Sequence, residues 1–257
     1  MKKKSIGIMV LLFFLCFGLS SAFSRTIKIG YVEFFPMTYT NDSGHPDGII
    51  INIAAQTLEK AGYEWTATSL PAKRLAKMLT QGDVQLWIGL STLPQFKDKV
   101  YISDTVVEKL TFRAYTIGKR NPIVKKQDLL GQTLLILRGY SYGGWINFIK
   151  DPLNQIQYIE FDSHETAFKR LEIFAENNRE CYLLDYQHPS EAVLKTHDIS
   201  NIHFNDISSL NIHFVVTQNM DGAKTVLDQI EKAFHQLVRE GIIKNFERKN
   251  KGKSELL

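Results

Sequence analysis

Cysteine is nearly absent from the sequence. Two of the 257 residues are cysteines, and the first, Cys16, lies in an N-terminal segment that we expect to be removed. Cys181 then remains alone, so the sequence excludes an intrachain disulfide. A single thiol cannot complete a cysteine-rich zinc site, and the seven histidines do not form an HExxH motif. We therefore predict a fold that depends on its hydrophobic core, with no metal and no cofactor.

An excess of charge of either sign is also missing. Three of the 31 lysine and arginine residues lie in the N-terminal segment, which leaves 28 basic residues against 27 acidic ones. This balance gives no electrostatic reason for binding nucleic acid, so we predict no nucleic-acid partner. The sequence also lacks a Gly-x-Ser-x-Gly elbow and a phosphate-binding loop, which argues against the hydrolases and nucleotide-binding enzymes that carry them.

The first 22 residues have the pattern of a secretory signal peptide. A basic start is followed by an apolar run from residue 6 to 19 and by the small residues Ser20, Ser21 and Ala22. We predict cleavage after Ala22 and a periplasmic location. An uncleaved membrane anchor is the alternative, although the run is shorter than the roughly 20 residues that span a bilayer. Leu15 argues against lipid attachment at Cys16, because a lipoprotein signal has a small residue there.

Strands and helices alternate along the remaining chain, which is long enough for one large domain or two smaller ones. The predicted strands are 26–31, 63–68, 84–88, 110–117, 133–137, 156–161, 181–184 and 212–216. The predicted helices are 48–61, 71–81, 145–149, 163–176 and 223–238. This alternation favours an α/β sheet with crossover connections over a sandwich or a helical bundle.

A polar loop at the end of one predicted strand is the first candidate site. The strand 84–88 runs into Gly89, Leu90, Ser91 and Thr92, and Pro94 follows. Open α/β sheets bind ligands at the carboxyl ends of their strands. Ser91 and Thr92 are therefore candidate ligand-binding residues.

Several short motifs, in their order and spacing, resemble the bacterial extracellular solute-binding proteins of family 3, periplasmic receptors that mainly serve polar amino-acid importers. The motifs are the helix after Gly48, Gly82–Gln85, Ser91–Pro94, Tyr101–Asp104, Leu130–Gly131, Leu137–Gly139, Leu184–Asp185 and Glu240–Lys244. The resemblance implies a two-lobed periplasmic binding protein fold of the type II kind, with two α/β lobes joined by hinge strands that close over a ligand. Lobe 1 would contain residues 25–114 and 213–250, and lobe 2 residues 115–212.

The resemblance also assigns roles to single residues. Ser91 matches a small polar residue that meets a ligand carboxylate, and Ser141 matches a hydroxyl residue at a helix start in lobe 2, where free N–H groups suit an anion. Asp185 matches the acid that pairs with a ligand ammonium group. Phe35 matches the aromatic residue that stacks on the ligand, with an offset of one residue left open.

The sequence departs from the family pattern at the ligand-binding arginine. In amino-acid-binding members this residue would lie two positions after Pro94, where the present chain has Phe96, and a phenyl ring cannot replace a bidentate guanidinium. Arg74 and Arg138 are the candidate substitutes. Three acids of the family pattern are also replaced, by Ile50, Asn52 and Gln85.

The function predicted from these residues is binding. We expect a monomeric periplasmic protein that captures a small polar solute, amino-acid-like or otherwise nitrogen-containing, for the membrane permease of an ABC importer. One alternative is an extracytoplasmic enzyme on the same scaffold, resembling dehydratases, with Asp185 or Glu33 as general acid. The other is a ligand-sensing subunit for a membrane receptor. Ser141, His164 and Asp185 are the residue types of a catalytic triad, but nothing in the sequence orients them.

Overall fold

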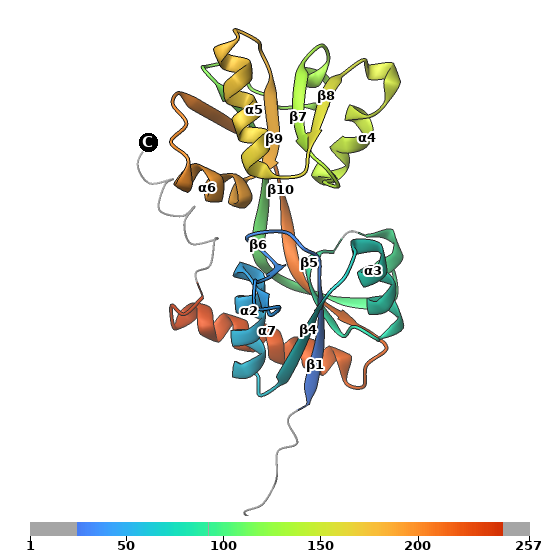
Figure 1. Ribbon diagram of the computed structural model, residues 1–257. Coiled ribbons are helices and arrows are strands. Elements are labelled where there is room, and N and C mark those ends of the chain that lie inside the picture. The colour runs from blue at the N-terminus through green and yellow to red at the C-terminus, as the bar shows by residue number, and fades with distance from the viewer. Residues whose placement is uncertain (1–24, 92, 244–257) are drawn as a thin grey trace, which may run out of the picture.

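The computed structural model describes residues 25–91 and 93–243, which form two lobes connected by two long strands (Figure 1). The predicted signal peptide, Thr92 and residues 244–257 lie outside the described residues. The strands are β1 (Thr26–Tyr31), β2 (Tyr39–Thr40), β3 (Pro46–Asp47), β4 (Glu64–Ser69), β5 (Leu86–Leu90), β6 (Val100–Ile117), β7 (Thr133–Leu137), β8 (Gln157–Phe161), β9 (Tyr182–Tyr186) and β10 (Ile202–Thr217). The α-helices are α2 (Ile49–Lys60), α3 (Ala72–Gln81), α4 (Trp145–Ile149), α5 (His164–Glu176), α6 (Gln187–Thr196) and α7 (Ala223–Arg239). Short 3₁₀ helices cover Pro94–Phe96, Lys126–Leu129, Tyr142–Gly144 and Pro152–Asn154.

One eight-stranded mixed sheet runs through both lobes in the order β4-β1-β5-β10-β6-β9-β7-β8. In lobe 1, β1 lies between β4 and β5 and is parallel to both, with α2, α3 and α7 around them (Figure 1). In lobe 2, β7 lies between β8 and β9, again in parallel, with α4, α5 and α6 around them. The two-lobed α/β fold expected from the sequence is therefore confirmed.

The strands β6 and β10 connect the two lobes, and they are longer than the sequence suggested. They pair with each other in antiparallel register over 18 and 16 residues, whereas the predicted strands 110–117 and 212–216 were short. The underpredicted parts carry polar residues such as Asp104, Asn205 and Asp206, which interrupt the apolar pattern of a buried strand. At one end β10 pairs with β5 of lobe 1, and near the other β6 pairs with β9 of lobe 2. The predicted lobe boundaries at 114/115 and 212/213 stay a prediction.

Local sequence signals explain where several helices begin and end. Pro71 precedes α3 and Gly82 ends it at φ +90°, a left-handed conformation that glycine adopts readily. The side chain of Ser163 caps α5 by accepting a hydrogen bond from the backbone N–H of Thr166. Helix α6 was not predicted, although Pro189 in its first turn is a typical start signal. None of the described helices is long and apolar enough to cross a membrane.

Candidate ligand-binding cleft

A cleft of about 380 Å³ lies between the two lobes. Its walls come from the loop after β1, from β5, from the loop after β7, from the end of β9 and from the two hinge strands. The lining residues are Val32, Glu33, Phe34, Met37, Thr38, Ile50, Trp87, Ile88, Gly89, Leu90, Leu110, Arg138, Gly139, Tyr140, Ser141, Tyr186 and Ile212. Because both lobes contribute, a change in the angle between them would open or close this cleft.

Aromatic rings from the two lobes meet across the cleft. The ring of Phe34 in lobe 1 packs edge to face on Tyr140 and on Tyr186 of lobe 2, with centroid distances of 5.4 Å and 5.6 Å. Tyr186 is largely buried, and burial raises the pKa of its hydroxyl to about 12. The Ser141 side chain and the backbone N–H groups of Gly143 and Tyr142 act in the opposite direction and lower this pKa. These donors lie at the start of the short helix that the family resemblance assigns to a ligand carboxylate.

Trp87 completes the aromatic wall on the lobe 1 side. Trp87 lies two residues before Gly89 on β5, so the side chain of Trp87 and the Cα hydrogen that replaces a side chain at Gly89 are on the same face of the strand. A Cβ atom at Gly89 would lie only 2.2 Å from the indole ring, so the glycine leaves the space that Trp87 occupies. Phe96, which is 2% exposed, packs edge to face with the indole at a centroid distance of 5.6 Å. The residue in the expected arginine position thus supports an aromatic wall.

Glu33 and Arg138 are the charged side chains among the described cleft residues. Burial disfavours the charged form of Glu33, but hydrogen bonds from Ser69 and Thr40 outweigh it and lower the pKa of the carboxyl below its ordinary value. The Nε of Arg138 donates to Oδ1 of Asp162 at 2.7 Å. This bond and the charge of Asp162 raise the pKa of Arg138, so its charge is already paired within lobe 2.

Comparison with protein-family models decides the family. The model of the bacterial extracellular solute-binding proteins, family 3, matches residues 27–253. The chain belongs to this family. Family 3 proteins are solute-binding proteins located outside the cytoplasm, so membership supports a binding role.

Solved structures share the fold of this family 3 protein at low sequence identity. An ancestral arginine-binding protein bound to arginine has a TM-score of 0.59 at 19% identity, over 84% of this chain and 93% of that one. The substrate-binding protein of an amino acid ABC transporter has a TM-score of 0.55 at 20% identity, over 84% and 94%. A histidine kinase sensor domain with similarity to periplasmic binding proteins has a TM-score of 0.63 at 15% identity, over 88% and 96%. A comparison with curated protein sequences gave no match.

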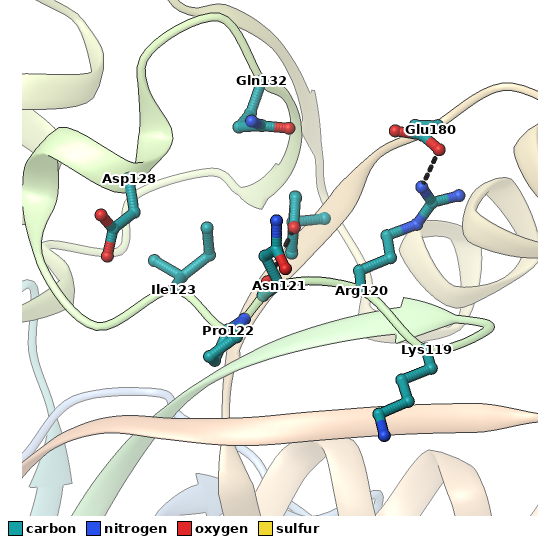
Figure 2. Close-up of a pocket in the computed structure, with 9 residues that line it drawn as sticks. Lys119, Arg120, Asn121, Pro122, Ile123, Asp128, Gln132 and Glu180 are labelled. Atoms are coloured by element: carbon teal, nitrogen blue, oxygen red, sulfur yellow. Dashed lines mark hydrogen bonds and ion pairs between the residues drawn. The ribbon is translucent and has the colours of Figure 1, made fainter.

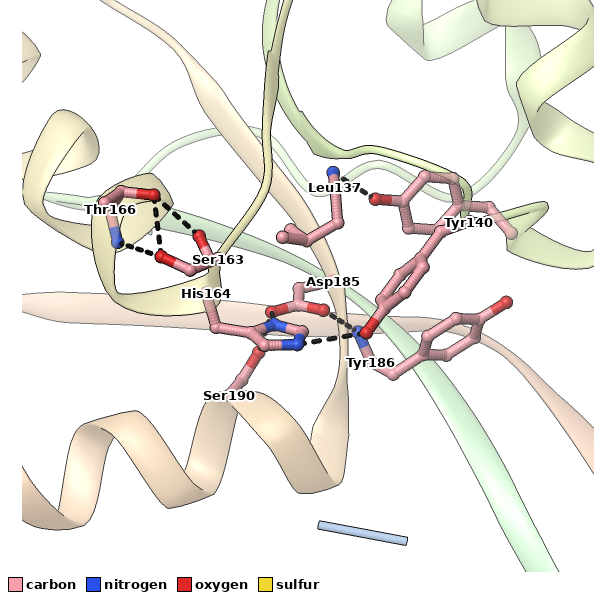
Figure 3. A network of polar contacts seen from close by, with 9 residues as sticks. Leu137, Tyr140, Ser163, His164, Thr166, Asp185, Tyr186 and Ser190 are labelled. Atoms are coloured by element: carbon pink, nitrogen blue, oxygen red, sulfur yellow. Dashed lines mark hydrogen bonds and ion pairs between the residues drawn. The ribbon is translucent and has the colours of Figure 1, made fainter. Parts of the chain in front are cut away.

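Asp185 of this family 3 protein lies beneath the cleft surface. Its side chain is 0% exposed, and its carboxylate accepts hydrogen bonds from Nδ1 of His164 at 2.7 Å, Oγ of Ser190 at 3.0 Å and the backbone N–H of Tyr186 at 2.7 Å (Figure 3). This differs from the predicted pairing with a ligand ammonium group, because protein donors already use the carboxylate and no part of it reaches the cleft.

The hydrogen bonds of Asp185 continue to the cleft through His164. A carboxylate with three donors only accepts, so the proton of a neutral His164 ring lies on Nδ1 and Nε2 accepts from the Tyr140 hydroxyl at 3.0 Å (Figure 3). The sequence named His164 and Asp185 together with Ser141 as possible triad members. In the structure the partner of the second imidazole nitrogen is Tyr140, and Ser141 lies instead by Tyr186.

The other predicted site residues divide into two groups. Arg138 and Ser141 line the cleft. Phe35 does not: it is 53% exposed and packs on Tyr39, while its neighbour Phe34 takes the place in the cleft. The cleft lining from β5 ends at Leu90, one residue before Ser91, and Thr92 lies outside the described residues. Arg74 is exposed on α3 and is not part of the lining.

The four aromatic residues of the cleft were not predicted as site residues: Phe34, Trp87, Tyr140 and Tyr186. Phe34, Tyr140 and Tyr186 lie at or just beyond the carboxyl end of a strand, which is the signal that could have found them, whereas Trp87 is the second residue of β5. Their residue type alone did not identify them as site residues, because aromatic residues are common in hydrophobic cores as well as in binding sites.

A second hollow of about 560 Å³ opens on lobe 2 alone, beside the loop that follows β6 (Figure 2). Most of its charges already have partners within the lobe: Arg120 forms an ion pair with Glu180 at 2.5 Å, and Asp128 accepts from the backbone N–H groups of Val124 and Lys125. These backbone bonds lower the pKa of Asp128. Since one lobe forms the whole hollow, movement of the lobes cannot close it on a ligand, and we place the candidate site between the lobes.

Proposed function

We propose that this chain is a periplasmic solute-binding protein that captures a small polar, nitrogen-containing solute between its lobes and presents it to the permease of an ABC importer. The observation that carries the proposal is the cleft itself, lined by both lobes and spanned by two hinge strands, with Phe34 of one lobe against Tyr140 and Tyr186 of the other. The predicted signal peptide supports a periplasmic location.

The likeness to amino acid ABC transporter binding proteins supports an importer as partner, while the likeness to a histidine kinase sensor domain favours a second candidate. In that role the closed form would contact a membrane receptor and transmit the presence of the solute. Pull-down from detergent-solubilised membranes, with and without solute, separates the two: a permease co-purifies in the first case and a receptor kinase in the second.

The binding role itself is tested by thermal denaturation. A ligand that binds only the folded state raises the melting temperature in a concentration-dependent way. We expect at least one compound from a screen of amines, amino acids, organic acids and sugars to do so, and chromatography to recover it chemically unchanged. A stabilising compound that is converted to a product would instead support the enzyme alternative with Glu33 as general acid.

A further inference from the structure

Of the three positions that the family resemblance assigns to a ligand carboxylate, Ser91 lies just outside the lining and the other two are occupied by protein side chains. In lobe 1, Phe96 stands in the arginine position and is buried against Trp87. In lobe 2, the donors at the helix start, Ser141 and the N–H groups of Tyr142 and Gly143, lie close enough to the hydroxyl of Tyr186 to lower its pKa. A carboxylate in this cleft would therefore lose its hydration without gaining these partners, which is costly.

The cationic side chain of the cleft is also engaged. Among the described lining residues Arg138 is the one cation, and its Nε lies 2.7 Å from Asp162, with Glu160 adding a second negative charge nearby. A ligand carboxylate would therefore compete with Asp162 for this guanidinium, although the pair is exposed and its loss costs little. Arg74, the other substitute suggested by the sequence, lies outside the lining.

The remaining features of the cleft favour a positive charge. The carboxylate of Glu33 lies in the lining; it accepts from the backbone N–H and the hydroxyl of Thr40 at 3.0 Å and 2.7 Å, and an ionised carboxylate has acceptor sites left for a cation. The buried carboxylate of Asp185 lies behind Tyr140 and Tyr186, and burial and this charge together raise the pKa values of both tyrosines. The aromatic side chains of Phe34, Trp87, Tyr140 and Tyr186 line the walls. Aromatic ring faces attract ammonium groups, most strongly when the cation is desolvated.

We infer that the cleft takes an organic cation without a carboxylate: an amine, guanidine or quaternary ammonium compound whose apolar body packs among the four aromatic rings while its charge lies near Glu33. This inference rests on the proposed binding function and narrows its substrate class. The acid Glu33 is then a ligand-binding residue, and the His164–Asp185 pair is a positioning device that holds the Tyr140 ring in the wall through its hydroxyl.

Matched pairs of probes test the inference. Isothermal titration calorimetry on the mature chain, residues 23–257, would compare phenethylammonium with phenylalanine, agmatine with arginine, and choline with glycine betaine. In each pair the first compound is a cation without a carboxylate and the second carries one. For every pair that binds, we expect the carboxylate-free cation to bind about tenfold tighter or more, a difference of about 1.4 kcal/mol.

A charge-removing variant locates the effect. Glu33→Gln keeps the side-chain shape and is expected to weaken binding of the cation about tenfold. Asp83→Asn removes an exposed carboxylate from the same lobe, outside the cleft, and is the matched control that should leave the affinity unchanged. Equal losses in both variants would contradict a role for Glu33 beyond the overall charge.

The outcomes separate this inference from the proposed function. If the carboxylate-bearing member binds as tightly as its partner or tighter, or if the thermal screen finds only acids or uncharged solutes, the cation class is wrong and the binding function stands. If no compound of any class binds, both fail. A different carboxylate-free amine found in the screen would support the inference.

Discussion

Nδ1 of His164, at the start of α5, lies 2.7 Å from Oδ2 of Asp185, near the end of β9. Through this contact the buried carboxylate orients an imidazole that in turn accepts from the hydroxyl of Tyr140, a cleft residue. Asp185 thus acts on the cleft indirectly, by fixing an aromatic wall and by placing negative charge behind it. Its loss would leave His164, Ser190 and the N–H of Tyr186 without their acceptor.

Replacing Asp185 by alanine should therefore destabilise the protein strongly. We expect the free energy of unfolding to fall by about 3 kcal/mol, the cost of removing one partner from a buried hydrogen-bonded charge network. Urea denaturation measures it. Asp162→Ala is the control, because the Asp162–Arg138 pair is exposed and such pairs contribute little to stability. If Asp185→Ala lost as little stability as Asp162→Ala is expected to lose, the hydrogen bonds of Asp185 would not be important for the stability of the fold.

Gly89→Ala should disturb the cleft through Trp87. The added methyl would lie 2.2 Å from the indole, so the ring must move, while the backbone at Gly89 accepts alanine without a positive φ. We expect a shift in intrinsic tryptophan fluorescence and a solute affinity lowered about tenfold. A double-mutant cycle with Trp87→Ala is the control: once the indole is gone, adding Gly89→Ala should cost no further affinity.

Asp162→Asn should change which solutes bind. The substitution removes the negative partner of Arg138 and leaves its guanidinium free in the cleft lining. We expect the preference for phenethylammonium over phenylalanine to shrink, because the free guanidinium can pair with the carboxylate. Calorimetry on both ligands measures the ratio. An unchanged ratio would show that Arg138 does not reach the ligand.

The single thiol of the mature chain should be unreactive in the folded protein. Cys181 is buried, and burial raises its pKa to about 11, so little of the reactive thiolate is present at neutral pH. An aromatic disulfide reagent should label the chain rapidly in guanidinium chloride and very slowly in buffer. Equal rates in the two solutions would contradict the burial of Cys181.

Binding of a cation should depend on pH through Glu33. Hydrogen bonds from Ser69 and Thr40 outweigh burial and put its pKa below the ordinary value of 4.5, so the carboxylate stays charged at mildly acidic pH. The hydrogen bonds stabilise the fold fully above that value and are lost as the pH falls through the lowered pKa. We expect cation affinity to fall only below about pH 4.5 in the wild type, and to lack this step in Glu33→Gln. A loss that begins near neutral pH would contradict the role of Glu33.

Much of the fold could be predicted from the sequence. The strand 133–137 and the helix 145–149 match β7 and α4 residue for residue, and Pro71, Gly82 and Ser163 marked helix ends correctly. These signals are local: an apolar run, a glycine with positive φ, a capping hydroxyl. The length of the hinge strands was underestimated. They pass between the lobes, where backbone pairing with a neighbouring strand maintains the strand even though its side chains are polar.

The site could be predicted only in part. Arg138 and Ser141 follow the strand β7 directly, and the rule that ligands bind at strand ends brought them to the cleft. Phe34 and Phe35 are adjacent residues of one type, so the sequence offers nothing to say which ring turns inward. Asp185 ends a strand as a ligand-binding acid would, but its burial depends on His164 and Ser190, which approach from two different helices.

The location of the solute between the lobes is the central claim, and one variant tests it directly. Ser141 is exposed and lines the cleft, so Ser141→Trp would fill the space without disturbing the core, while Ser43→Trp adds the same ring to an exposed turn away from it. Calorimetry with a compound from the thermal screen should give one bound solute per chain in the wild type and in Ser43→Trp, and none in Ser141→Trp. Unchanged affinity in Ser141→Trp would contradict a site between the lobes.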